Sequence, residues 1–98
     1  MAHYRIVLSP DDNDTLLVTS PDFPELVTFA DDDASAELRA YSAMLEAISA
    51  RIAVGDDLPA PINRLQTGDR CVPLSLNVEA KVALYRCLRS VGINRARH

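Results

Sequence analysis

The stretch DDDASAELRAYSAMLEAISARIAVG, residues 31–55, decides the fold because it predicts one long helix with clear ends. Three aspartates open it, and aspartate is both a good N-cap and a favourable charge at the positive end of a helix dipole. Alanines recur through it, and Gly55 stands where a glycine commonly ends a helix. We therefore expect a helix from about Ala34 to Val54. Its apolar seam, which we expect to face a sheet, consists of Leu38, Tyr41, Leu45, Ile48 and Ile52.

Three short strands are expected before this helix. Residues 3–9 alternate between apolar and polar side chains, and residues 10–14 contain the proline, aspartates and asparagine of a turn. Residues 15–20 form a second, more apolar strand, so the first two strands predict an antiparallel hairpin. Residues 26–30 form a third strand after two prolines have interrupted the pattern.

After the helix, residues 56–68 form a connector and residues 71–76 a fourth strand, placed at an edge because Pro73 cannot donate to a ladder. Asn77 is expected to cap a second helix that runs to about Ser90 and stops before Gly92. Cys87 is expected to be buried in it. The apolar positions at helical spacing are Ala80, Leu84, Cys87, Leu88 and Val91.

The order β-β-β-α-β-α predicts an α+β fold, a sheet with one long helix packed on a face and a C-terminal helix after it. We expect a β-β-β-α-β domain over residues 1–76, with residues 77–98 holding the second helix and the beginning of a further segment. The 98 residues fit one domain. They contain no run long and apolar enough to span a membrane, and the N-terminus lacks the pattern of a signal peptide, so a cytoplasmic protein is expected.

Charge is divided unevenly along the chain. Residues 1–60 hold three basic and twelve acidic residues, a net charge of −9, whereas residues 61–98 hold seven basic and two acidic ones, a net charge of +5. An acidic region repels nucleic acid and attracts a basic partner, and a basic region does the opposite. The alternative is that both are simply solvated surfaces.

No pattern of catalytic residues is evident. The histidines, His3 and His98, stand at opposite ends, so no Ser–His–Asp set is convincing, and Cys71 and Cys87 lack an obvious base or metal-ligand spacing. The aspartates of residues 11–14 and 31–33 could hold a divalent cation, but turn formation for the first group and helix capping for the second explain them better. We expect no enzyme activity, no metal and no cofactor. A residual metal-dependent nuclease is the alternative, and it would need carboxylates converging on two ions.

The order of landmarks resembles the HicB antitoxin family. A strand at residues 4–8 and an acidic turn precede the run LVTSPDFPELVT, residues 17–28, followed by an alanine-rich helix and the exit GDDLPAP, residues 55–61. The family carries a PDxPG-like turn and a D/E-x-I/L-P-x-P exit; here Glu25 stands where the family usually has glycine. Residues 72–74 and 80–85 are similar to the fourth strand and first C-terminal helix of longer members. Their helix-turn-helix is represented only by residues 92–96, so we expect it to be truncated.

The resemblance implies a partial RNase H-like fold without catalytic carboxylates. It implies an antitoxin that binds HicA, a small basic mRNA-cleaving toxin, covers the toxin's active site, forms homodimers or larger homo-oligomers, and in longer members represses its own operon. An orphan oligomerising regulatory module without a toxin is the alternative. The acidic residues that we expect to contact the toxin are Asp11, Asp12, Asp14, Asp22, Glu25, Asp31, Asp32 and Asp33. The basic residues that could contact nucleic-acid phosphates are Arg86, Arg89, Arg95 and Arg97. Specific DNA binding is not expected without the second helix of the motif.

Overall fold

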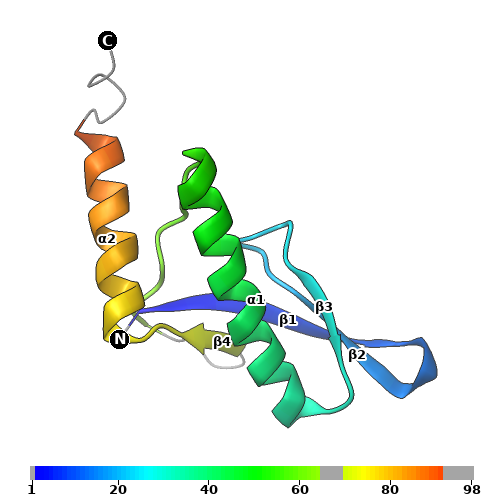
Figure 1. Ribbon diagram of the computed structural model, residues 1–98. Helices are drawn as coiled ribbons and strands as arrows, with labels where there is room; N and C mark the ends of the chain where they lie inside the picture. The colour runs from blue at the N-terminus through cyan, green and yellow to red at the C-terminus, as the bar shows by residue number, and fades with distance from the viewer. Residues whose placement is uncertain (1, 65–69, 92–98) are drawn as a thin grey trace.

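A computed structural model describes residues 2–64 and 70–91 of the chain (Figure 1). Its elements are β1 (His3–Asp11), a short 3-10 turn (Asp12–Asp14), β2 (Thr15–Thr19), β3 (Val27–Ala30), α1 (Asp33–Val54), β4 (Arg70–Pro73) and α2 (Leu76–Ser90). The predicted α+β class and the order of elements are confirmed. The division into domains at residue 76 stays a prediction.

The described strands form a four-stranded antiparallel sheet in the order β3-β2-β1-β4. The β1–β2 hairpin and the adjacent β3 make the predicted meander, and β4 pairs with the first half of β1. β4 is an edge strand, as Pro73 indicated, because Pro73 has no amide hydrogen for a further ladder. The connector is joined to the same part of β1, since His3 exchanges two backbone hydrogen bonds of 2.8 Å with Ile62.

α1 crosses one face of the sheet, and the core lies between them (Figure 1). The predicted seam was wrong by about a quarter of a turn of the helix. Leu38 is 71% exposed, and of the seam only Ile48 is buried. The face that packs on the sheet is mostly small: Ala36, Ala40, Met44, Ala47 and Ile48.

The volume of two buried aromatic rings explains why small residues of α1 face the sheet. Tyr4 of β1 and Phe23 of the β2–β3 connection are fully buried, with their rings 4.8 Å apart in an edge-to-face arrangement. These rings fill much of the space under the helix, so the opposing helical face must supply small side chains. A seam chosen for its bulkiest residues therefore points partly to solvent.

Both ends of α1 are fixed by local contacts. Asp32 accepts a hydrogen bond of 2.8 Å from the backbone N–H of Ser35, and the Ser35 hydroxyl is 3.3 Å from the backbone nitrogen of Asp32, which completes a capping box. At the other end, Gly55 adopts φ 79°, a left-handed conformation that favours glycine. The two ends predicted from sequence are thus confirmed.

α2 begins earlier than predicted, and its cap is Ser75 rather than Asn77. The Ser75 hydroxyl accepts a hydrogen bond of 3.3 Å from the backbone N–H of Val78. The prediction that Cys87 is buried was also wrong, because its side chain is exposed. Val82 is the one buried residue of α2, so the apolar positions at helical spacing lie on the side turned away from the body of the protein.

Candidate partner-binding surface

Six of the acidic residues expected to contact a toxin lie at one end of the sheet. The β1–β2 hairpin turns there, and β3 leads into α1. The register brings these segments together, because Asp11 pairs with Thr15 and the next residue, Leu16, pairs with Ala30 at the end of β3. We call this region the acidic end, and it consists of Asp11, Asp12, Asp14, Asp31, Asp32 and Asp33.

The tip of the hairpin presents its carboxylates to solvent. Asp11, Asp12 and Asp14 are exposed. Asn13 and Asp14 adopt φ of 67° and 61°, the left-handed region that asparagine and aspartate tolerate better than most side chains. The residue types at the tip are therefore explained by the turn, and the turn leaves their charges available to a partner.

At the start of α1 the three aspartates have different surroundings. The Asp32 carboxylate accepts hydrogen bonds from Ser35, first of all from its backbone N–H, and these hold the pKa of Asp32 below its usual value. Asp33 lies 3.9 Å from the guanidinium of Arg70 and keeps an exposed side chain. Asp31 is exposed as well. Asp32 is thus needed by the helix, while the other two carboxylates remain open to a partner.

Asp22 and Glu25 lie at the opposite end of β2 and bind within the protein. Asp22 accepts hydrogen bonds from the backbone N–H of Arg5 at 2.9 Å and from its guanidinium at 3.2 Å. Glu25 accepts two hydrogen bonds of 2.7 Å from Arg51, and these lower the pKa of Glu25. The Arg51 guanidinium also lies 4.6 Å from the centre of the Phe23 ring. Their role as toxin contacts stays a prediction, but both carboxylates already serve the fold.

Glu25 occupies a turn that does not require glycine. The turn is closed by a hydrogen bond of 2.9 Å from the Leu26 amide to the Phe23 carbonyl. Among residues 2–64 and 70–91, positive φ occurs only at Asn13, Asp14 and Gly55. Glu25 therefore avoids the strained left-handed region, and its side chain is used to hold α1 through Arg51.

Sequence reasoning missed the face of the sheet that α1 leaves uncovered. Val7, Val27 and Phe29 are 46%, 57% and 49% exposed there, and Leu17 is half-buried between them. The alternation of the strands contained the signal, since Val7 interrupts the polar side of β1 and β3 is apolar at alternate positions. We call these four residues the outer-face patch.

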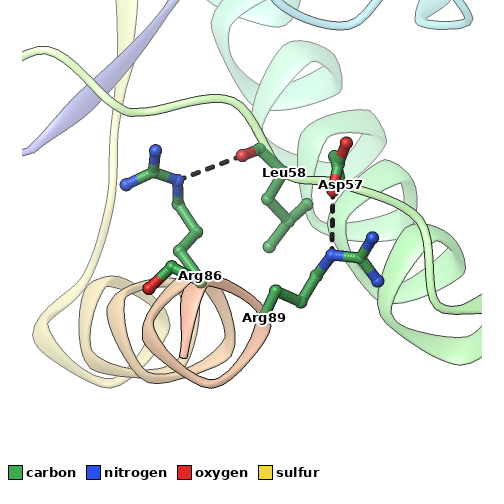
Figure 2. A pocket seen from close by; sticks show the side chains of 5 residues that line it. Asp57, Leu58, Arg86 and Arg89 are labelled. Carbon is green, nitrogen blue, oxygen red and sulfur yellow. Dashed lines mark hydrogen bonds and ion pairs between the residues drawn. The ribbon is translucent and has the colours of Figure 1, made fainter. Parts of the chain in front are cut away.

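Two of the predicted phosphate contacts are hydrogen-bonded to the connector. Arg86 donates from Nε to the Leu58 carbonyl at 3.1 Å, and Arg89 donates from Nε to the Asp57 carboxylate at 2.8 Å (Figure 2). Arg89 also donates to the Gly55 carbonyl. A cavity of about 380 Å³ is lined by Asp57, Leu58, Arg86, Arg89 and Ser90. Arg95 and Arg97 lie outside the described residues, and phosphate binding by all four stays a prediction.

The described residues show no arrangement typical of a metal or a membrane site. Over residues 2–64 and 70–91, no three of the histidine, cysteine, aspartate and glutamate side chains are grouped so that they could hold an ion. In the same residues no helix has both the length and the apolar character needed to cross a bilayer. The acidic end offers binding chemistry by charge, and the outer-face patch and the exposed apolar positions of α2 offer it by apolar surface.

Comparison with known proteins gives a family and a fold. Residues 3–83 match the family model described as the HicB-like antitoxin of bacterial toxin–antitoxin systems. The structure is similar to a crystal structure of the N-terminal domain of the Burkholderia pseudomallei antitoxin HicB, with a TM-score of 0.57 and 19% sequence identity. That likeness covers 76% of this chain and 99% of the other. A comparison with curated proteins gave no match.

Proposed function

Because this chain belongs to the HicB-like antitoxin family, we propose that it binds a small basic mRNA-cleaving toxin of the HicA type and neutralises it by covering the active site. The proposed role is one of binding in the cytoplasm, without catalysis. A toxin that holds RNA phosphates must present a basic surface. The acidic end is the observation that supports this proposal most strongly, because it gathers six carboxylates at one end of the sheet.

The acidic end is suited to steering the encounter. Exposed charges at the rim of an interface act mainly on the association rate and on its dependence on salt. Asp12, Asp14 and Asp31 are the best candidates, since they are exposed and, within residues 2–64 and 70–91, no hydrogen bond or ion pair ties their side chains to another element. Asp32 is a poor candidate because its carboxylate caps α1.

The test is co-expression with the small basic protein encoded beside this chain's gene. We expect growth to be rescued and a stable complex to be purified, with the toxin's active-site histidine replaced for binding measurements. Asp12→Asn with Asp14→Asn should lower the association rate by about 3-fold at low salt. The matched control is Glu37→Gln with Glu46→Gln, which removes two exposed charges from α1. Absence of such a gene, or a toxin that kills in the presence of the chain, contradicts the proposal.

We further propose that the protein self-associates through α2. An apolar stripe on the side of α2 turned away from the body supports this, and it consists of Leu76, Ala80, Leu84, Cys87, Leu88 and Val91. Leu84 is 60% exposed and Leu88 40%. A stripe of this kind is self-complementary across a two-fold axis. Sedimentation velocity should show a dimer that Leu84→Gln with Leu88→Gln dissociates; a wild-type monomer at high concentration contradicts it.

The orphan oligomerising module is the second candidate function, and the same α2 stripe favours it. It differs from the antitoxin in one respect, since it needs no toxin. A residual role in autoregulation would depend on Arg86 and Arg89, whose Nε atoms already donate within the protein. We therefore expect weak, salt-sensitive DNA binding at most. A gel shift showing tight and sequence-specific binding to the upstream DNA would overturn that expectation.

A further inference from the structure

The outer-face patch is continuous across three strands. Val7 of β1 pairs with Thr19 of β2, which pairs with Val27 of β3, and in the next outward-facing row Leu17 of β2 pairs with Phe29. Side chains directly opposite each other in an antiparallel ladder are about 5 Å apart at Cβ. The exposed valines and the exposed ring therefore form one apolar surface that reaches β3, an edge strand of the described sheet.

This surface lacks the composition expected of a solvated sheet face. An antiparallel sheet with one face on a core usually turns polar side chains to water on the other. Here α1 covers the face of Tyr4, Ile6 and Val18, and the uncovered face carries a half-exposed phenylalanine on an edge strand. Exposed apolar patches rimmed by polar residues mark protein-interaction sites.

The charges around the patch select the kind of partner. Asp11 follows Val7 and Ser9 on the same face of β1, and Asp12 and Asp14 come directly after it in the hairpin turn. On the other side, Arg5 is paired with Asp22, which balances its charge. The patch thus has an apolar centre, an acidic border at one side and a balanced ion pair at the other. A basic protein would meet this acidic border with opposite charge.

We propose that the outer-face patch is the centre of the interface with the basic toxin, where an apolar element of the toxin packs on Val7, Leu17, Val27 and Phe29. This inference rests on the proposed function and deepens it. The acidic border then accelerates the encounter, and the patch determines how long the complex lasts. Side chains that become fully desolvated near the centre of an interface carry most of the affinity, while charges at the rim carry little.

The test measures rates of binding to the histidine-replaced toxin by surface plasmon resonance. The variant is Val27→Thr with Phe29→Thr, chosen because threonine keeps the preference of these positions for a strand. We expect the dissociation constant to rise about 30-fold, almost entirely through faster dissociation. The matched control is Leu38→Gln with Val54→Gln, which removes two exposed apolar side chains from α1 and should leave toxin binding within about 2-fold.

Each outcome decides a different point. Failure of the wild-type chain to bind the toxin contradicts the proposed function itself. Tight wild-type binding that Val27→Thr with Phe29→Thr leaves unchanged overturns the patch while preserving the antitoxin. A dimer lost in that variant, with toxin binding intact, would make the patch a contact between copies of this chain and would also overturn the inference. Thermal unfolding of each variant establishes that the fold is retained.

Discussion

α1 and α2 are both amphipathic helices, yet they are attached to the protein in opposite ways. α1 is held by its apolar side, with Ala40 and Met44 fully buried against the sheet. α2 places Val82 in the core and is otherwise held by polar contacts: Tyr85 donates to the Asp56 carbonyl at 2.7 Å, and Arg86 and Arg89 bind the connector. Its apolar stripe faces solvent. An apolar helical face can therefore be buried within the chain, as in α1, or exposed, as in α2.

The largest expected effect tests this contrast directly. Met44→Ala should lower the free energy of unfolding by about 2–5 kcal/mol, because it opens a cavity beneath α1. Leu84→Ala on α2 should change it by less than about 0.5 kcal/mol in the monomer, since the side chain is 60% exposed. Urea denaturation at low protein concentration measures both. Equal losses of unfolding free energy in the two variants would mean that the apolar stripe of α2 packs on the rest of the protein.

A second prediction concerns the contact between the core under α1 and the connector to which α2 is bound. Tyr4 lies in the core under α1, and its hydroxyl donates to the Pro59 carbonyl of the connector at 2.7 Å. Burial raises the pKa of Tyr4 to about 12 from an ordinary value of 10.0. The unfolded chain then loses this proton first, so stability is complete below pH 10 and falls as the pH rises from about 10 to 12. The loss should be on the order of 2 kcal/mol.

Unfolding by urea at pH 9 and at pH 11.5 checks this expectation. Tyr4→Phe serves as the control, because it keeps the ring beside Phe23 and removes the ionisable group. The variant should be less stable at pH 9, where the Pro59 carbonyl loses its donor, and should show a flatter alkaline dependence. A wild-type stability that is constant up to pH 12 would contradict the burial of a neutral hydroxyl.

The smallest effect concerns the start of α2. Ser75→Ala should lower stability by about 1 kcal/mol, because it removes the acceptor for the Val78 amide. Asn77→Ala should change it by only a few tenths of a kcal/mol, because Asn77 lies inside the helix. Native-state hydrogen exchange of the α2 amides compares the two. The reverse ranking would restore Asn77 as the cap.

Local patterns predicted most of the elements, and tertiary contacts decided the rest. Gly55 and the aspartates before α1 act through neighbouring backbone, so the ends of that helix followed from sequence. The buried side of α1 did not, because it depends on how much volume Tyr4 and Phe23 occupy below it. The burial of Cys87 was predicted wrongly for a similar reason. Periodicity places residues on one face of a helix, but it does not say whether that face packs on the protein or points to solvent.

The candidate surface was predictable in its charges and not in its apolar centre. The acidic residues are visible in the composition, although sequence could not show that Asp22 and Glu25 are bound by Arg5 and Arg51. The outer-face patch arises from pairing between β1, β2 and β3. Its members are separated in sequence and meet only in the register of the sheet.

The most direct test of the antitoxin proposal is a titration of the purified wild-type chain against the RNA-cleaving activity of the basic toxin that we propose is encoded beside it. We expect cleavage to fall linearly with added chain and to stop at a fixed stoichiometric ratio, with Val27→Thr and Phe29→Thr together requiring a clear excess. Cleavage that continues at full rate in the presence of excess wild-type chain would contradict the account.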